Sequence, residues 1–573
     1  MKTLNKLKQT TKLYEKEYFV FDTETRGLRA KSDAFIFGVV YGFDTCEILY
    51  SVEDFKREFL KPKYKRKKVF AHNAEYDLNV IYDNIYSLDK EAIFNGKFIC
   101  ATNGNCTFAD SLNIFRTSVK ELGKIIGKEK QDIETEYIEG TKDIIVTKRM
   151  IDYCIRDCEI VYESLLYIFS LVGNIKITIA GLSLDYFRRN YLPFNIDYNE
   201  SLEEKFFNSY VGGRCEAFYI GKTSSYVYDV NSMYPNAMLK SKFPNPKFLR
   251  NMPSINLNSF YKHILPNYEG CAKFKVFHKT TYFGYLPLKK DGKLLFPVGT
   301  FEGYYNFNEI RFAIKCDMIV ILEVSDLTFS EGMESPFKDF VIDTYNRRKT
   351  SKIEIEKTTL KLILNSLYGK FAQRVKTKMI YIDNMDIQIN IIKEYALKEK
   401  LIKIHPFNSV RKDCFIEVKN DRGFLYHTIP SFSSYITSYS RIELLKLFIK
   451  YESSGIVYCD TDSIFVNKKL PIENSDKLGE LKLEDKIISE IRGLKNYSYI
   501  SENKQKDKIK GIPKTAEMTD YSKYKYKTLV GTKEGLRRNK LPGVQENRVK
   551  IITGKYNKRI VLIDGNTLAI CLD

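Results

Sequence analysis

The sequence predicts an α/β and α+β protein with more than one domain. Three observations lead to this fold class: the length of the chain, its content of apolar side chains, and two carboxylate clusters that lie far apart in the sequence. At 573 residues and 67.0 kDa, the chain exceeds the size at which a single hydrophobic core stops growing. Hydrophobic residues make up 44% of it and aromatic residues 14%, which is ample for burial and argues against disorder. We therefore expect two compact lobes.

The charge of the chain indicates a polyanionic partner. There are 92 Lys and Arg residues against 72 Asp and Glu residues, a formal net charge of +20. Nucleic acid is the leading candidate because it offsets such an excess of positive charge. Each basic run taken alone is more typical of a solvated face, so the inference depends on the whole set: Lys61–Lys68, Arg347–Lys352 and Lys504–Lys510.

The cysteines and the apolar segments indicate the cellular compartment of the protein. The 11 cysteines form no CxxC pair, and no His cluster stands at metal-ligand spacing, which favours reduced thiols. No uncharged run reaches membrane-spanning length, and the basic N-terminus lacks a continuous apolar region. We expect a soluble cytoplasmic protein without a membrane partner, which for a phage-encoded chain means the cytoplasm of the host.

The first carboxylate cluster follows an apolar segment near the N-terminus. In EYFVFDTET, residues 18–21 predict a buried strand that runs into Asp22 and Glu24. Alternate side chains of a strand share a face, so these two carboxylates can bind one metal ion together. For a lone pair of this kind, a strand end facing solvent is an equally good interpretation.

Two further segments add carboxylates to this pair. FAHNAEYDLNV places Asp77 at an apolar helical pattern, and MIDYCIRDCEIVYESLLYIF predicts an amphipathic helix that carries Tyr153 and Asp157. A spacing of four residues puts this phenol and carboxylate on one helix face. The sequence therefore predicts a pocket of four carboxylates, Asp22, Glu24, Asp77 and Asp157, with Tyr153 placed to orient an attacking water.

DTET, NAEYD and YCIRD resemble the three exonuclease motifs of the DnaQ-type 3′–5′ exonucleases, whose domain has an RNase H-like fold. The resemblance implies that two metal ions activate the water and stabilise the leaving 3′ oxygen. It also implies a set of contacts to the single-stranded 3′ end and, at Lys130, to its phosphate. The residues of that set are Thr25, Asn73, Tyr76, Ser111 and Leu112.

The second carboxylate cluster combines two segments of the C-terminal half. TSSYVYDVNSMYPNAM predicts a strand that ends at Asp229 and a helix that starts near Pro235. GIVYCDTDSIFV predicts a hairpin with Asp460 and Asp462 at its tip. A sheet can bring these strand ends together, and nucleotidyl transfer needs such carboxylates to hold two Mg²⁺ ions.

Between these segments, EIEKTTLKLILNSLYGKFAQR predicts a helix. Lys357, Lys361, Asn365 and Tyr368 fall on one stripe of a helical wheel, beside a stripe of leucines. A cationic stripe of this length suits a triphosphate. Taken alone, the segment is more typical of an ordinary amphipathic surface helix.

DVNSMYP, KLILNSLYG and YCDTDS follow one another in the order of motifs A, B and C of family B DNA polymerases, and closely resemble them. The resemblance implies metal ligation by Asp229, Val230 and Asp462, with Asp460 essential nearby. It further implies that Tyr234 excludes a ribose 2′-OH by steric clash. The residues that it places around the incoming nucleotide are Lys349, Lys357, Lys361, Asn365 and Tyr368.

Two shorter strings extend this resemblance. SYVGGRCE, with Tyr210, Gly212 and Gly213, resembles the YxGG motif that joins the two lobes and contacts the template. LKNYSY resembles the KxY motif that holds the primer terminus, through Lys495 and Tyr497. Its register stays open, because Tyr499 can take the place of Tyr497.

The length and the motif order resemble the protein-primed replicases of bacteriophages and linear plasmids within family B. Asp229 and Lys361 are 132 positions apart, which leaves room for a first insertion over 240–336. Phe371 and Tyr458 are 87 positions apart, and strand-like alternation, as in MIYIDNMDIQINII at 379–392, suits a second insertion over 372–428. In these replicases the first insertion docks the terminal protein, and the second supports processive strand displacement.

The resemblance implies a right-hand polymerase attached to an exonuclease domain. We expect the exonuclease domain over 1–171 and the polymerase domain over 172–573. Within the latter, the palm is expected over 172–239 and 429–520, the fingers over 337–371 and the thumb over 521–573.

The sequence thus predicts a DNA-directed DNA polymerase with 3′–5′ proofreading that uses two Mg²⁺ or Mn²⁺ ions in each active site. Its expected partners are a DNA template and primer, dNTPs, and a terminal protein that supplies the first hydroxyl, with the chain a monomer or a heterodimer with that protein. Three alternatives stay open: a nucleic-acid-primed or primer-independent family B enzyme, a nuclease whose second lobe only clamps DNA, and a non-catalytic nucleic-acid-binding protein.

Overall fold

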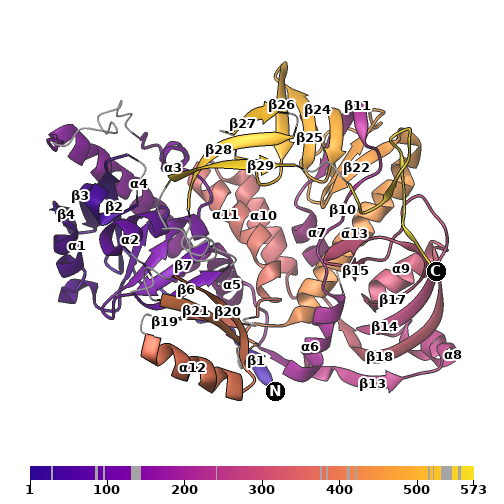
Figure 1. Ribbon diagram of the computed structural model, residues 1–573. Coiled ribbons are helices and arrows are strands. Elements are labelled where there is room, and N and C mark those ends of the chain that lie inside the picture. Colours follow the sequence, from indigo (N-terminus) through magenta and orange to yellow (C-terminus); the bar gives the residue numbers. More distant parts are fainter. Residues whose placement is uncertain are drawn as a thin grey trace.

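The computed structural model in Figure 1 describes the chain from residue 1 to 573, with gaps. The gaps are 28–29, 84, 86–87, 95–96, 131–143, 241, 375–376, 383–384, 409–412, 420–422, 514–515, 521, 531–544 and 553–555. Parts of the ranges expected for the second insertion and the thumb therefore lie outside the described residues. No helix of the described ranges is both long and apolar enough to cross a membrane.

The N-terminal lobe is built on a seven-stranded mixed sheet of order β4-β3-β2-β5-β8-β7-β6. Strand β2 runs parallel to β5, and β5 runs parallel to β8, so these three strands end at the same edge. The strands are β2 (Tyr18–Thr25), β3 (Phe35–Gly42), β4 (Thr45–Leu49), β5 (Lys68–Ala71), β6 (Asp89–Phe94), β7 (Lys97–Thr102) and β8 (Thr107–Asp110).

Four helices accompany this sheet: α1 (Val52–Glu58), α2 (Ala74–Tyr82), α3 (Val119–Ile126) and α4 (Lys148–Val172). Helix α4 starts where the Thr147 hydroxyl accepts a hydrogen bond from Met150 N and ends at Gly173, which has a φ of 70°. A threonine cap and a left-handed glycine are typical boundaries of a helix. Because α4 packs on β2 and β3, its Asp157 comes close to the acidic end of β2.

A second sheet, antiparallel throughout, forms the base of the C-terminal lobe, with the order β10-β22-β23-β11-β24-β25-β26. The predicted strand before Asp229 and the predicted hairpin around Asp460 are both present. The strands are β10 (Cys215–Ala217), β11 (Gly221–Val230), β22 (Ile456–Asp460), β23 (Ser463–Val466), β24 (Leu481–Gly493), β25 (Asn496–Ser501) and β26 (Lys504–Ile509). Helices α6 (Glu200–Ser209), α7 (Met233–Lys240) and α13 (Pro430–Tyr451) belong to the same lobe.

Helices α10 (Lys338–Thr350) and α11 (Glu354–Ser366) pack against each other and against α5 (Ile179–Asn190) or α7. The helix predicted over 354–374 is shorter than expected. It ends at Ser366, and a 3₁₀ turn over Tyr368–Lys370 follows. Glycine is a poor helix former, and Gly369 lies in this turn. Tyr368 therefore leaves the helical stripe of Lys357, Lys361 and Asn365.

The range 240–336 contains its own sheet of order β12-β18-β14-β17-β32, with β13 paired to β18. Its final strand comes from the C-terminus of the chain, and runs parallel to β17. The strands are β12 (Phe243–Pro244), β13 (Arg250–Ser254), β14 (Tyr268–His278), β17 (Val298–Asn306), β18 (Ile319–Met333) and β32 (Cys571–Leu572). Also present are the hairpin β15 (Leu288–Lys290) and β16 (Lys293–Leu295), and the helices α8 (Leu257–Ser259) and α9 (Phe307–Lys315).

The range 372–428 holds a three-stranded sheet with one helix beside it (Figure 1). The strands are β19 (Thr377–Ile382), β20 (Leu401–Asn408) and β21 (Asp413–Lys419), and the helix is α12 (Met385–Leu397). The strand-like interpretation of 379–392 is thus wrong for its second half. Alternation of isoleucines fits a strand, but Ile391, Ile392 and Tyr395 pack on the sheet as one helical face, whereas Ile389 is 55% exposed.

The C-terminal segment forms β27 (Glu517–Asp520), β28 (Lys523–Leu529) and β29 (Gln545–Ile551), which pair in that order. A short hairpin follows, β30 (Ile560–Val561) with β31 (Thr567–Leu568). At the other end of the chain, β1 (Lys2–Leu4) pairs with β9 (Ile196–Tyr198). The described residues of the C-terminal segment are thus rich in strands.

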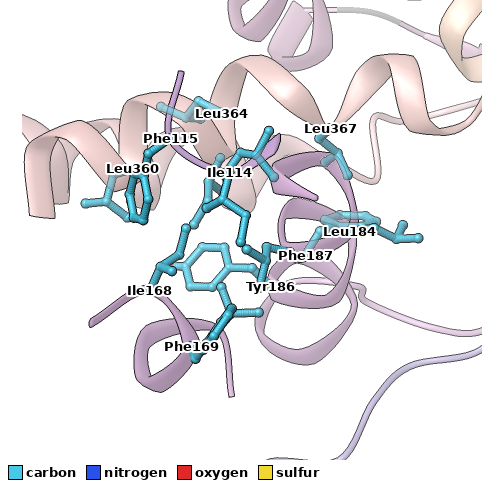
Figure 2. Packing of buried hydrophobic residues seen from close by; sticks show 14 of the residues in the cluster. Ile114, Phe115, Ile168, Phe169, Leu184, Tyr186, Phe187, Leu360, Leu364 and Leu367 are labelled. Carbon is cyan, nitrogen blue, oxygen red and sulfur yellow. The ribbon is translucent and has the colours of Figure 1, made fainter. Parts of the chain in front are cut away.

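A shared hydrophobic core joins the two lobes. Figure 2 shows Ile114, Phe115, Ile168 and Phe169 of the N-terminal lobe beside side chains of α5 and α11. The labelled side chains of those two helices and the residue that follows α11 are Leu184, Tyr186, Phe187, Leu360, Leu364 and Leu367. Burial of these large apolar groups in one cluster holds the lobes together.

Candidate active sites

The structure brings the four N-terminal carboxylates together. Asp22 and Glu24 alternate with the buried Thr23 and Thr25 along β2, so both face the same side. Asp77 lies in the first turn of α2, where its Oδ1 accepts hydrogen bonds from Thr23 N (3.1 Å) and Thr23 Oγ1 (2.7 Å). The charges of Asp77, Glu24 and Asp157 all act on Asp22.

The electrostatics of this pocket favour a bound cation. Burial raises the pKa of Asp22 well above its usual range, and the neighbouring carboxylates raise it further. Burial likewise raises the pKa of Asp77 to about 7, although the Thr23 donors act in the opposite direction. Like charges held this close oppose one another's ionisation unless a cation joins them. The oxygen ligands are those that Mg²⁺ prefers.

Lys130 reaches into the pocket beside Tyr153. Its Nζ forms an ion pair with Asp157 Oδ2 and lies 4.5 Å from the centroid of the Tyr153 ring. The other oxygen of this carboxylate, Asp157 Oδ1, is buried and has no hydrogen-bond partner among the described residues. A buried acceptor of this kind suits a metal ligand. The predicted set therefore fits a divalent cation.

Cys154 also lies at this site, which the sequence did not predict. Its Sγ is 3.7 Å from Asp22 Oδ2, and one ligand atom from each of Asp22, Glu24 and Cys154 lies within 4.8 Å of the others. Cys154 follows Tyr153 on α4 and stands three positions before Asp157. A search for cysteines on the acidic face of that helix would have found it.

The residues expected to hold a single-stranded 3′ end form three groups of contacts. Thr25 Oγ1 lies 2.5 Å from Tyr76 Oη. Asn73 N (3.0 Å) and Leu112 N (2.9 Å) both donate to Asp110 Oδ1, a carboxylate that the sequence analysis missed. Ser111 is fully buried, and its Oγ lies 2.8 Å from a ring nitrogen of His72.

The C-terminal carboxylates meet where β11 and β23 pair. Asp229 is the register partner of Ser463, and Val230 N donates to Asp462 O (2.8 Å). Between Asp460 and Asp462, Thr461 has a φ of 67°, and its N donates to Arg214 O (2.6 Å). The tight turn therefore places Asp462 beside Asp229.

These carboxylates are also difficult to ionise without a cation. Burial first, and then the charges of Asp462 and Glu484, raise the pKa of Asp229 to about 7. Burial and the charge of Asp460 raise the pKa of Asp462. Asp460 itself has a cationic partner, because Lys495 Nζ lies 3.1 Å from its Oδ1. The sequence did not single out Glu484, which no short motif marks.

The candidate nucleotide-binding residues lie on α10, on α11 and just beyond them. Lys349 is in the last turn of α10. Lys361 and Asn365 are exposed on α11, and the charge of Lys361 reaches Asp229. Lys357 pairs with Glu354 (3.1 Å). Tyr368 stacks on Tyr234, with ring centroids 4.2 Å apart.

The Tyr210–Gly213 segment lies against the acidic turn. A side chain at Gly213 would come within 2.7 Å of Thr461 Cγ2 and 3.1 Å of Tyr234 Oη, whereas Gly212 has open space. Lys289 Nζ donates to Tyr210 O (3.0 Å).

Tyr497 is buried, whereas Tyr499 is partly exposed. Their rings lie 6.3 Å apart at neighbouring positions of one strand face. The register of the KxY-like string stays open.

The motif order and the geometry can now be compared with known proteins. A family model described as DNA polymerase type B, organellar and viral, matches residues 124–454, which is more than half of the chain. The chain belongs to the organellar and viral type B DNA polymerases. The expected family is thereby confirmed.

Among the relatives of this type B polymerase, a probable DNA polymerase of Podospora anserina is 28% identical over 445 residues, covering 69% of this chain and 36% of the relative. A DNA-directed DNA polymerase of Enterobacteria phage PRD1 is 25% identical over 466 residues and covers 77% and 75% of the two chains. The first curated relatives are much longer, and the chain spans 36% to 42% of their length.

The fold of the type B polymerase is similar to that of the Phi29 DNA polymerase. The solved complex with primer-template DNA and incoming nucleotide superimposes with a TM-score of 0.67 at 17% identity, covering 94% of this chain and all of that one. The predicted fold class is thereby confirmed: an N-terminal exonuclease-type α/β domain followed by an α+β right-hand polymerase lobe.

Proposed function

We propose that this type B polymerase adds dNTPs to a primer 3′ end on a DNA template, and that its N-terminal lobe removes nucleotides from that end by 3′–5′ hydrolysis. One observation carries the proposal: the pairing of β11 and β23 seats Asp462 beside Asp229, and the Tyr234–Tyr368 stack lies close by. Separate carboxylates at the end of β2 supply the second site in the same chain.

The two carboxylate sets would each hold two Mg²⁺ or Mn²⁺ ions. Asp229, Asp462 and the main chain at Val230 would bind them in the palm. Asp22, Glu24, Asp77 and Asp157 would bind them in the N-terminal lobe. Such ions, when bound, lower the pKa of an attacking hydroxyl or water and neutralise charge on the reacting phosphorus. Asp460 keeps Lys495 close to the palm site through their 3.1 Å ion pair.

In the palm site, the side chains of this chain orient the nucleotide and the DNA. The cations Lys349, Lys357 and Lys361 bind the triphosphate, and the charge of Lys361 already reaches Asp229. Asn365 and Tyr368 position the base. The Tyr234 ring occupies the space of a ribose 2′-OH. Contacts to the template and to the primer come from Tyr210, Gly212, Gly213, Lys495 and Tyr497.

In the N-terminal site, Tyr153 orients the attacking water, and Lys130 neutralises the phosphate of the terminal nucleotide. The ion pair of Lys130 with Asp157 places its ammonium next to that phenol. The single strand is held by Thr25, Asn73, Tyr76, Ser111 and Leu112.

The architecture supports assigning the proposed activities to separate domains. The exonuclease domain is assigned to 1–171, the palm to 172–239 and 429–520, the fingers to 337–371 and the thumb to 521–573. The separate sheets within 240–336 and 372–428 fit two insertions. The first would dock a terminal protein that supplies the priming Ser, Thr or Tyr hydroxyl, and the second would close around the template during strand displacement. The chain would act as a monomer or as a heterodimer with that protein, in the cytoplasm of its host.

Two variants separate the two activities. Asp22→Ala/Asp77→Ala should abolish release of nucleotides from labelled single-stranded DNA and leave dNTP incorporation intact. Asp229→Asn should do the reverse. Asp152→Ala, at an exposed position of α4 next to Tyr153, serves as the matched control and should change neither. Absence of dNTP incorporation by the unmodified chain and by every variant would overturn the polymerase assignment and leave a nuclease.

Protein priming has its own test. The chain is incubated with labelled dNTP and a candidate terminal protein, without nucleic-acid primer. Label that stays on the partner after denaturation supports a terminal protein. Extension of an annealed primer with an unlabelled partner would instead favour the nucleic-acid-primed alternative.

A further inference from the structure

A second group of basic side chains lies where the N-terminal lobe, α5, the turn after α11 and the segment before α13 meet. Lys68 opens β5, Lys176 precedes α5, Arg188 lies in its last turn, Lys370 ends the turn after α11, and His427 precedes α13. We call this set the junction cluster. It uses no residue assigned above to either active site.

The junction cluster holds more positive charge than its neighbours neutralise. Asp185 pairs with Lys176 (3.3 Å) and Arg188 (3.6 Å), and also accepts a hydrogen bond from Asn174 Nδ2 (2.6 Å). Within the described ranges, Lys68 and Lys370 form no ion pair. Two of the four cationic side chains thus pair with Asp185 and the other two form no ion pair in the described ranges, which leaves an excess of positive charge that an anion would offset.

The side chains of the cluster act on one another. The charge of Lys176 lowers the pKa of both Lys68 and Lys370, adding to the effect of burial, so Lys176 lies within electrostatic reach of both. For Lys370 the pKa falls to about 8. Lys370, Arg188 and Lys176 all lower the pKa of the buried His427, after the larger effect of burial. Arg188 also contacts Tyr426, whose ring packs against that of His427, so these side chains lie near one another.

Within the junction cluster, His427 has a buried ring nitrogen that lacks a partner in the described residues. Lys370 Nζ donates to Gln373 Oε1 (2.5 Å), so that oxygen is an acceptor, and His427 Nε2 lies 3.3 Å from the same atom. Nε2 must then carry the hydrogen, and Nδ1 keeps its lone pair. The His427 side chain is 4% exposed, and Nδ1 has no hydrogen-bond partner among the described residues. Buried polar atoms without partners are rare in folded proteins.

We propose that the junction cluster binds a phosphate group. The ammonium groups of Lys68, Lys176 and Lys370 supply charge-assisted donors, and the Arg188 guanidinium borders the site. An arriving phosphate favours proton uptake at His427, so that Nδ1 becomes a donor to the anion. Binding of phosphate therefore removes both the excess of cations and the unpartnered nitrogen.

The position of the cluster separates it from the exonuclease carboxylates. Lys68 is the register partner of Tyr18 at the start of β2, four residues before Asp22. At a strand rise of roughly 3.3 Å per residue, the two sites lie at opposite ends of that strand. A DNA strand that contacts the cluster would touch the N-terminal lobe and the turn after α11 at once. A phosphate that belongs to a DNA strand rests on the proposed function. Binding of free inorganic phosphate or pyrophosphate does not depend on that function.

The first experiment measures the affinity for single-stranded DNA against salt concentration, without divalent cations. Lys176→Gln and Lys68→Gln should each lower the salt slope by about one, as expected for a lost phosphate contact. Lys315→Gln, which removes an exposed cation of α9, is the matched control and should leave the slope unchanged. Lys68→Gln removes no ion pair and relieves repulsion among the cations, so it should not lower the midpoint of thermal unfolding.

The second experiment distinguishes the sources of phosphate. With ¹⁵N-labelled histidine, of which the chain has 5, addition of single-stranded DNA or of pyrophosphate should move the His427 resonances to those of a doubly protonated imidazole. A response to DNA alone assigns a strand phosphate, and a response to pyrophosphate alone assigns free phosphate. Unchanged resonances with both ligands, together with unchanged salt slopes in both variants, would overturn the proposal. Neither readout needs catalysis, so loss of dNTP incorporation is scored separately.

Discussion

The Tyr234 ring stacks on the Tyr368 ring, with centroids 4.2 Å apart and an angle of 20° between their planes. Tyr234 lies at the start of α7, just after the strand that carries Asp229, and Tyr368 lies in the turn after α11. The stack therefore joins α7 to the turn after α11, and under the proposed function it lies where the deoxyribose of the nucleotide would bind. Because stacked aromatic pairs prefer this offset geometry, each ring restricts the other.

Tyr234→Val should let the polymerase accept ribonucleotides. The smaller side chain vacates the space of the 2′-OH, so the ratio of kcat/KM for dNTP over rNTP is expected to fall by at least about tenfold, which corresponds to roughly 1.4 kcal/mol. Single-nucleotide incorporation on a primed template measures this ratio. Tyr368→Phe keeps the stack and serves as the control. Equal discrimination by Tyr234→Val and the unmodified chain would contradict the steric role.

Gly213 and Gly212 should respond differently to the same substitution. An added Cβ at Gly213 would meet Thr461 Cγ2 at 2.7 Å and Tyr234 Oη at 3.1 Å, whereas at Gly212 it meets nothing within 4 Å. Gly213→Ala must therefore displace the acidic turn, and kcat for synthesis should fall by about tenfold or more, because small misplacements of catalytic groups are costly.

Primer extension under saturating dNTP compares the two alanine variants. Gly212→Ala is the matched control and should retain most of the activity. Exonuclease activity reports on folding, since both variants should keep it. If Gly212→Ala lost as much synthesis as Gly213→Ala, a close approach at Gly213 would not be the cause.

Local patterns predicted those parts of the fold and sites in which one segment acts alone. The strand before Asp22, the helix around Tyr153 and the hairpin around Asp460 each have a clear period or turn, and the structure contains all three. Contacts between distant segments leave no such signal. Asp110 could not be found because its role, as acceptor for Asn73 N and Leu112 N, exists only after β5 and β8 have paired.

The helix α12 shows why a local period can also mislead. Residues 385–392 alternate isoleucine with polar residues, which fits a half-buried strand. The packing surface in the structure instead selects Ile391, Ile392 and Tyr395 of a helix, and leaves Ile389 exposed. Four isoleucines among eight residues fit both the two-residue period of a strand and the 3.6-residue period of a helix. Only the tertiary contacts with β19–β21 decide between the two structures.

The buried ion pair between Arg441 and Glu309 should hold the Tyr210–Gly213 segment in place. Both side chains are about 1% exposed, with Arg441 Nε 2.8 Å from Glu309 Oε1, and the Arg441 guanidinium donates to Val211 O (2.7 Å) and Gly212 O (3.0 Å). Arg441→Met leaves Glu309 as an unpaired buried charge, which costs about 3–5 kcal/mol. The midpoint of thermal unfolding should fall accordingly.

A double variant tests whether that cost comes from the unpaired charge. Arg441→Met/Glu309→Leu removes both charges, so its midpoint should lie above that of Arg441→Met alone, since uncharged side chains can replace a buried ion pair at little cost. Strictly additive losses would show that the two residues act independently.

The stability of the protein should depend on pH and Mg²⁺ together. The pKa values of Asp77 and Asp229 are each raised to about 7, above the value of about 3.9 in an unfolded chain. Each group therefore contributes stability that is complete below about pH 4 and is lost as the pH rises through about 7. Under the proposed function Mg²⁺ binds the ionised carboxylates, and it should then offset that loss.

Thermal unfolding with and without Mg²⁺ measures this linkage. The cation should raise the midpoint more at about pH 8 than at about pH 5.5, because protons compete with it at the lower pH. Asp77→Asn/Asp229→Asn should reduce both the fall in stability with rising pH and the gain from Mg²⁺. Glu203 is a fully buried carboxyl that accepts hydrogen bonds from Ser431, and burial raises its pKa to about 7. Because Glu203 remains in that variant, a part of the pH dependence that does not depend on Mg²⁺ should remain as well. If Mg²⁺ raised the midpoint of unfolding equally at both pH values, or equally in the variant and in the unmodified chain, these carboxylates would not bind the ion.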